Sequence, residues 1–147
     1  MPTDLPRLIG INHVALEVGD IDQALAFYGK IFSFTLRGRG GGQAFIDMGD
    51  QFLALMQTET PHQDRGRHFG LVVDHRDRIR ELAEAAGAKM VDGPFVDFVD
   101  PWGNRIEIVA YADVQFSKAP NVLRGMQFAG EKSADAKKQL AKKNMAP

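Results

Sequence analysis

Two histidines and one glutamate lie on segments with the alternating pattern of β-strands. His13 stands near the start of one such segment, His68 begins a second, and Glu107 lies in the middle of a third. Two neutral imidazoles and one carboxylate suit a divalent metal ion that keeps open positions for water and substrate. These three residues are therefore the candidate metal ligands, provided that the strands bring them together.

In each segment the candidate ligand lies on the face opposite the bulky apolar residues, because successive side chains of a strand point to opposite faces. The apolar faces contain Val14, Leu16 and Val18 in the first segment, Phe69, Leu71 and Val73 in the second, and Ile106 and Ile108 in the third. We expect helices to cover these apolar faces, while the ligand faces line a concavity if the sheet curls.

Each of these residues has a simpler interpretation when it is taken alone. A strand histidine is more often a hydrogen-bonded structural residue, and Glu107 could be a half-exposed strand carboxylate. The joint placement favours the metal site, because an inward carboxylate is costly unless it is paired or metal-bound. His62 and His75 lie in polar segments and are expected to be exposed.

The order strand, helix and three further strands occurs twice along the chain. A helix is predicted over 21–32 after Asp20 as its N-cap, and a second over about 74–86 that Gly87 ends. Pro101 and Gly103 mark a tight hairpin turn before the last strand.

This repetition predicts the organisation of the chain. We expect a first module over 9–57, a linker over 58–67, a second module over 68–112 and an extension over 113–147. The extension contains a short basic helix that Ser133 could cap. It is either a solvated tail or a segment that packs on a partner.

Composition narrows the classes of function. The formal net charge of −1 favours neither nucleic acid nor an anionic membrane as a partner. The chain has no cysteine, which excludes thiolate metal sites. No signal-peptide pattern and no apolar run of membrane-spanning length occurs, so a cytoplasmic location is the expectation.

Several stretches resemble the vicinal oxygen chelate superfamily, also called the glyoxalase/bleomycin-resistance/dioxygenase superfamily. They are Asn12–Val18 with Ala24–Tyr28, His68–Val73 and Phe98–Glu107. The resemblance implies an α+β fold, in which two paired βαβββ modules form a curled, cup-shaped mixed sheet with helices on its outer face.

The same resemblance implies a divalent metal ion at the positions of His13, His68 and Glu107. The ion would be Fe(II), Mn(II), Zn(II) or Ni(II), and a small substrate would bind it through vicinal oxygens. Such proteins often form homodimers, so the ligands could come from one chain or from two. A non-catalytic, antibiotic-binding protein is the alternative, and no catalytic residue is assigned. Glu17 and Tyr28 are conceivable helpers, although a rim position for Glu17 and helix packing for Tyr28 are the favoured interpretations.

The chain departs from particular members of the superfamily. Glyoxalase I-like members add a glutamate from the fourth strand, whereas 51–57 contains no acidic residue. Fosfomycin thiol transferases and extradiol dioxygenases have a closer ligand set. The transferases usually have a threonine where this chain has Ala15. Arg37, Arg39 and Arg105 could supply the positive charge that a phosphonate needs.

Overall fold

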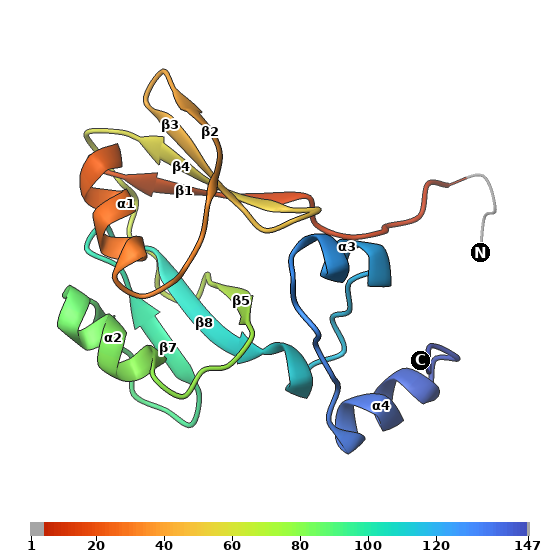
Figure 1. Cartoon of the computed structure of the whole chain (residues 1–147). Helices are drawn as coiled ribbons and strands as arrows, with labels where there is room; N and C mark the ends of the chain where they lie inside the picture. Colours follow the sequence, from red (N-terminus) through yellow and green to blue (C-terminus); the bar gives the residue numbers. More distant parts are fainter. Residues whose placement is uncertain (1–4, 147) are drawn as a thin grey trace.

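A computed structural model describes residues 5–146 of the chain (Figure 1). It contains two four-stranded mixed sheets with helices, which confirms the predicted α+β fold of two βαβββ modules. The first module consists of β1 (His13–Val18), α1 (Ile21–Gly29), β2 (Leu36–Gly40), β3 (Gln43–Asp47) and β4 (Phe52–Gln57). The second consists of β5 (Phe69–Val73), α2 (Ile79–Ala86), β6 (Lys89–Met90), β7 (Val96–Val99) and β8 (Arg105–Ala110).

The two sheets have the same topology. Their strand orders are β1-β4-β3-β2 and β5-β8-β7-β6, and the first and last strands of each module pair in parallel. The register places His13 opposite Phe52 in the first sheet and Glu107 opposite Gly70 in the second. The sheets remain separate, so a single chain does not form a closed cup.

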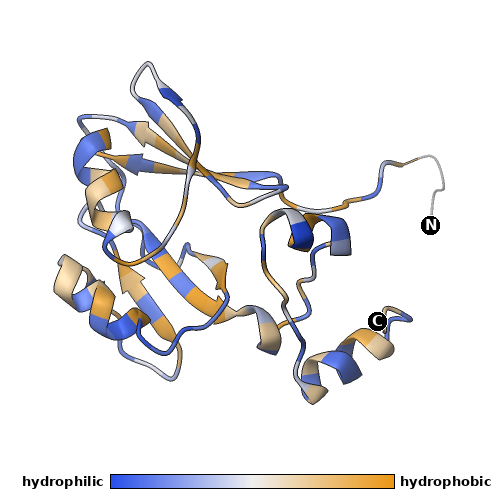
Figure 2. Cartoon of the chain, viewed as in Figure 1, coloured by the Kyte–Doolittle hydropathy of each residue, from blue (hydrophilic) through white to orange (hydrophobic). Residues whose placement is uncertain are grey.

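The apolar faces of both sheets bury their side chains in one shared core with α1 and α2. Apolar residues run along these strands and along the inner sides of the helices in Figure 2. The largest fully buried side chains of this core are Tyr28, Phe98, Leu55, Ile106, Ile108 and Val18. Because side chains alternate along a strand, the faces that carry His13 and Glu107 point away from this core.

A buried carboxylate joins the modules. Asp100, only 4% exposed, accepts hydrogen bonds from the Trp102 and Asn104 backbone N–H groups, the Asn104 side chain and the Tyr28 hydroxyl. Burial raises the pKa of Asp100, although these hydrogen bonds act in the opposite direction. Burial and the neighbouring carboxylate raise the pKa of Tyr28 well above its ordinary value. Asp100 thus stabilises the last hairpin turn and also attaches α1 to it.

Several predicted helix bounds were wrong. The second helix begins at Ile79 rather than near residue 74, since Asp74 accepts a hydrogen bond from the adjacent His75 N–H and does not cap the helix. The first ends at Gly29, where Lys30 and Ile31 bond to the carbonyls three residues earlier and tighten the last turn. Asp20 and Ser133 act as N-caps and Gly87 as the stop, as predicted.

The extension packs on the protein. It contains a 3₁₀ turn (Tyr111–Asp113), α3 (Pro120–Gly125) and α4 (Ala134–Ala141), of which α3 was not predicted. Lys118 donates to the Met48 carbonyl and to Asp50 at the β3–β4 turn, where α3 lies in Figure 1. No helix of residues 5–146 is both long and apolar enough to cross a membrane.

Replacing Tyr28 with phenylalanine should lower the free energy of unfolding by about 1–3 kcal/mol, since it removes a donor from a buried carboxylate. Urea denaturation measures the loss. Tyr111→Phe is the control, because its hydroxyl only accepts a bond from the Lys118 N–H. An equal loss in both variants would contradict a special role for Asp100.

Candidate metal centre

His68 and Glu107 lie close together on the outward face of the second sheet. The His68 Nε2 atom is 3.8 Å from the Glu107 Oε2 atom, and their side chains are 41% and 24% exposed. The Nδ1 atom of His68 lies 2.9 Å from the Gly66 carbonyl, which can only accept. The Nδ1–H group therefore donates to this carbonyl, and Nε2 is the ring nitrogen that faces Glu107.

His13 lies on the outward face of the first sheet, with a matching arrangement. Its Nδ1 atom is 2.9 Å from the Asn12 Oδ1 acceptor, so Nε2 is again free to bind a metal. Its ring stacks on the Phe52 ring at a centroid distance of 4.7 Å and an interplanar angle of 7°. Each imidazole is thus oriented by a hydrogen bond, as metal-binding histidines usually are.

A single chain does not unite the three candidate ligands. Within residues 5–146, no group of three or more His, Asp or Glu side chains could hold a metal ion. The structure therefore brings His68 and Glu107 together and leaves His13 apart from them. The residue types of the three candidate ligands suit a divalent ion, but the described part of one chain does not bring them to one place.

Glu107 has open space beside it on β5 and charged side chains beside it on β7 and β8. Gly70, opposite on β5, has no side chain, and a Cβ atom there would meet nothing within 4 Å. On β7 the opposite residue is Asp97, which binds the Arg105 guanidinium at 2.8 Å. Hydrogen bonding to Asp97 raises the pKa of Arg105, and the charge of Glu107 acts in the same direction. The second oxygen of buried Asp97, Oδ1, has no partner in the described part of the chain.

The loop before β5 is fixed by its own polar residues. Asp64 accepts from the Arg67 side chain and the Arg105 N–H, and its own N–H donates to the Gly103 carbonyl. The Arg105 guanidinium donates to the Arg65 carbonyl at 2.7 Å. This loop, predicted only as a linker, therefore holds His68 in a defined place beside β8.

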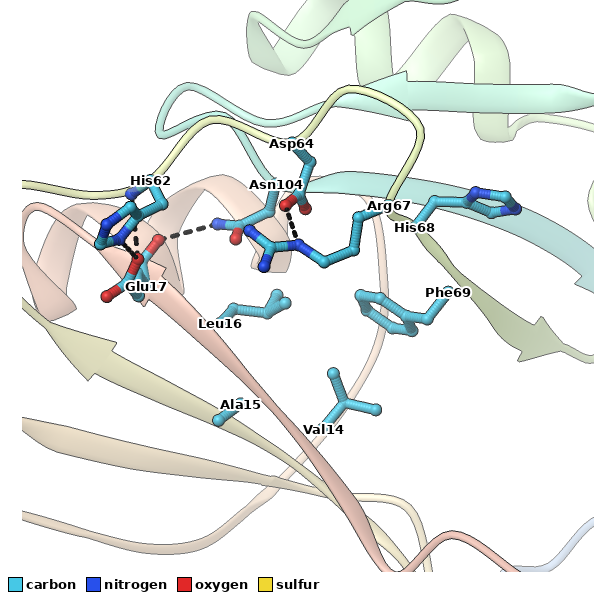
Figure 3. Close-up of a pocket in the computed structure, with 10 residues that line it drawn as sticks. All are labelled: Val14, Ala15, Leu16, Glu17, His62, Asp64, Arg67, His68, Phe69 and Asn104. Carbon is cyan, nitrogen blue, oxygen red and sulfur yellow. Dashed lines mark hydrogen bonds and ion pairs between the residues drawn. The ribbon is translucent and has the colours of Figure 1, made fainter.

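A cavity of about 480 Å³ separates β1 from this loop. The His62 Nδ1 atom lies 2.8 Å from the Glu17 Oε1 atom at one end of it, and His68 lies towards the other end (Figure 3). Hydrogen bonds from the backbone and ring of His62 lower the pKa of Glu17. Of the three candidate ligands only His68 lines this cavity, so the cavity adjoins the metal site and does not contain it. The exposure predicted for His62 is confirmed, but its partner Glu17 was not predicted.

The sequence of this chain matches a family model over residues 10–108. The model describes the Glyoxalase/Bleomycin resistance protein/Dioxygenase superfamily. The chain belongs to this superfamily. The fourth strand, β4, contains no acidic residue, so the extra glutamate of glyoxalase I-like members is absent here.

Two known proteins are similar to this chain in sequence. Glutathione transferase FosA of Serratia marcescens is 25% identical over 113 residues, which cover 69% of this chain and 80% of the relative. Metallothiol transferase FosB of Lysinibacillus sphaericus is 26% identical over 111 residues, covering 66% and 79%. Both relatives are transferases by name, which points to enzymatic activity in this part of the superfamily.

A FosX variant of Listeria monocytogenes has a similar fold. That structure, in complex with Mn(II) and 1S,2S-dihydroxypropylphosphonic acid, has a TM-score of 0.60 and 19% sequence identity. The match covers 69% of this chain and 90% of that one. At this identity the likeness establishes the fold alone.

Replacing Asp64 with alanine should loosen the loop that carries His68, since it removes the acceptor of two hydrogen bonds, from the Arg67 side chain and from the Arg105 N–H. We expect amide hydrogen exchange over residues 62–68 to accelerate by roughly tenfold. Glu59→Ala, an exposed acid of the same segment, is the matched control. Equal exchange in the two variants would show that Asp64 does not hold the loop.

Proposed function

We propose that this protein is a metal-dependent enzyme whose small substrate binds a divalent ion through two neighbouring oxygens. The proposed ligands are His68 and Glu107 of one copy and His13 of a second copy. The observation that carries the proposal is the orientation of both histidines. Each directs its Nδ1–H to an oxygen acceptor and leaves Nε2 free, and the Nε2 atom of His68 already faces Glu107.

A homodimer accounts for the separation of His13 from the other two ligands. The shared core occupies the apolar faces of both sheets, so both ligand faces point outward and cannot face each other within one chain. A two-fold axis would place the first sheet of each copy against the second sheet of the other and form two equivalent cups. Each cup would then receive one histidine from one copy and the His–Glu pair from the other.

The bound ion would supply Lewis-acid polarisation of the substrate oxygens, or activation of dioxygen if it is Fe(II). The chain's own residues orient the site. The Gly66 carbonyl orients the His68 ring, and Gly70 leaves room beside Glu107. The hydrogen bonds of Asp64 fix the loop before β5. His and carboxylate ligands are compatible with Fe(II), Mn(II), Zn(II) or Ni(II).

Transfer of a thiol to fosfomycin is a second candidate reaction, which the two transferase relatives favour. The metal requirement would be the same. Phosphorus NMR of the Mn(II)-loaded protein with fosfomycin and glutathione or cysteine tests it directly. Unchanged fosfomycin with both thiols would exclude this reaction and leave the general proposal in place.

We expect each of three variants, His13→Ala, His68→Ala and Glu107→Ala, to bind Mn(II) roughly 100-fold or more weakly, because each lacks one of three proposed ligands. Calorimetric titration of the metal measures the loss. His75→Ala is the control, since His75 is exposed and is not one of the proposed ligands. Wild-type protein that binds none of the four metals would favour the non-catalytic, antibiotic-binding alternative.

Mixing two inactive variants tests whether the site spans two copies. His13→Ala and His68→Ala should each lack a complete site, but a mixed dimer contains one wild-type ligand set. Random exchange of subunits should therefore restore about one metal site in four. The measurement is Mn(II) binding after the variants are unfolded and refolded together. No recovery, from variants that refold alone, would place all three ligands in one chain.

A further inference from the structure

The C-terminal extension contacts the β3–β4 turn through a buried lysine. Lys118 donates to the Met48 carbonyl at 2.8 Å and to the Asp50 carboxylate. Its side chain is only 8% exposed, and a buried ammonium group is costly unless hydrogen-bond acceptors surround it. The two acceptors lie on either side of Gly49, so Lys118 holds both ends of the turn.

The helix α3 covers the same turn (Figure 1). A Cβ atom on Gly49 would lie 3.3 Å from Val122 Cγ1 and 2.5 Å from Met126 Sδ. The φ angle of Gly49 is +84°, a conformation that glycine adopts without strain. The extension therefore packs on the turn by van der Waals contact as well as by hydrogen bonds. It lies outside residues 10–108, which the family model matches.

The turn leads directly into the residues that hold the start of β1. The Met48 N–H donates to the Gln51 carbonyl at 3.0 Å and closes the turn. The Gln51 side chain donates to the Ile11 carbonyl at 2.7 Å. The Phe52 N–H donates to the Asn12 carbonyl at 3.2 Å. Residues 11 and 12 are therefore fixed by the two residues that follow the turn.

Asn12 and Phe52 in turn orient His13. The His13 Nδ1–H donates to the Asn12 side chain, and the imidazole stacks on the Phe52 ring. The segment before β1 gives little support, because Leu8 and Ile9 are almost fully exposed. A continuous series of direct contacts thus runs from the extension to the candidate ligand.

We propose that Lys118 is a positioning residue of the metal centre, which holds His13 in its metal-binding orientation through the β3–β4 turn. The inference rests on the proposed function, because it requires His13 to be a metal ligand. Lys118 acts through Gln51 and Phe52 rather than by contact with the metal. Groups that orient a ligand from behind commonly change metal affinity when they are lost. His13 depends on such support, because the other two proposed ligands lie on a different sheet.

Two substitutions in the full chain test this inference. Lys118→Met should weaken Mn(II) binding by about tenfold in a calorimetric titration, and Asp50→Ala, which removes one of two acceptors, by less. Nitrogen-15 NMR of the metal-free protein, with neutral imidazoles, should show only the Nδ1–H tautomer of His13 in the wild type. Both variants should show a mixture of tautomers, because the Asn12 acceptor is no longer held. Lys137→Met removes the same charge from an exposed site of the extension and should change neither readout.

A double-mutant cycle tests the route of the effect. Gln51→Ala removes the hydrogen bond to Ile11 and should weaken Mn(II) binding to a similar extent as Lys118→Met. The double variant should lose less affinity than the two single losses combined, because both substitutions act on one series of contacts. Additive losses would overturn this inference alone.

Two further outcomes separate this inference from the proposed function. An unchanged His13 tautomer in both Lys118→Met and Asp50→Ala would overturn the positioning role while wild-type protein still binds Mn(II). Asp50 is half-exposed, so Asp50→Ala keeps this test available if Lys118→Met does not fold. Wild-type protein without Mn(II) affinity would overturn the proposed function and, with it, the role of Lys118 at a metal centre.

Discussion

The hydrogen bonds of the Asp100 carboxylate determine how the two modules sit against each other. This buried group binds two backbone N–H groups of its own turn, the Asn104 side chain and the hydroxyl of Tyr28 on α1. Asn104 in turn donates to the Glu17 carbonyl on β1. A charge buried so deeply is tolerable only when its acceptor sites are filled, so the turn, α1 and β1 must keep one arrangement. The positions of β1 and β8, and with them His13 and Glu107, follow from it.

That arrangement explains why one chain does not bring the three candidate ligands together. The helices and the apolar strand faces meet in the shared core, and strand alternation then forces the faces that carry the candidate ligands outward. The ordered loop before β5 reinforces this division, because it ties the segment of His68 to β8 and the β7–β8 turn rather than to β1. The separation of His13 from His68 and Glu107 is therefore a consequence of the packing.

Strand alternation in the sequence was sufficient to predict on which strand face each candidate ligand lies, while the repeated order of elements and the family resemblance predicted the fold. It was not sufficient to predict contacts that depend on three-dimensional neighbours. The hydrogen bonds of Asp64 and Arg65 join the loop before β5 to residues that lie 39 to 41 positions further along the chain. The short helix α3 has no apolar periodicity from which it could be predicted. The separation of His13 from His68 could not be predicted from the alternation of side chains along each strand either. The alternation assigns a residue to one face of its sheet, whereas the relative orientation of two sheets depends on the packing of the helices between them.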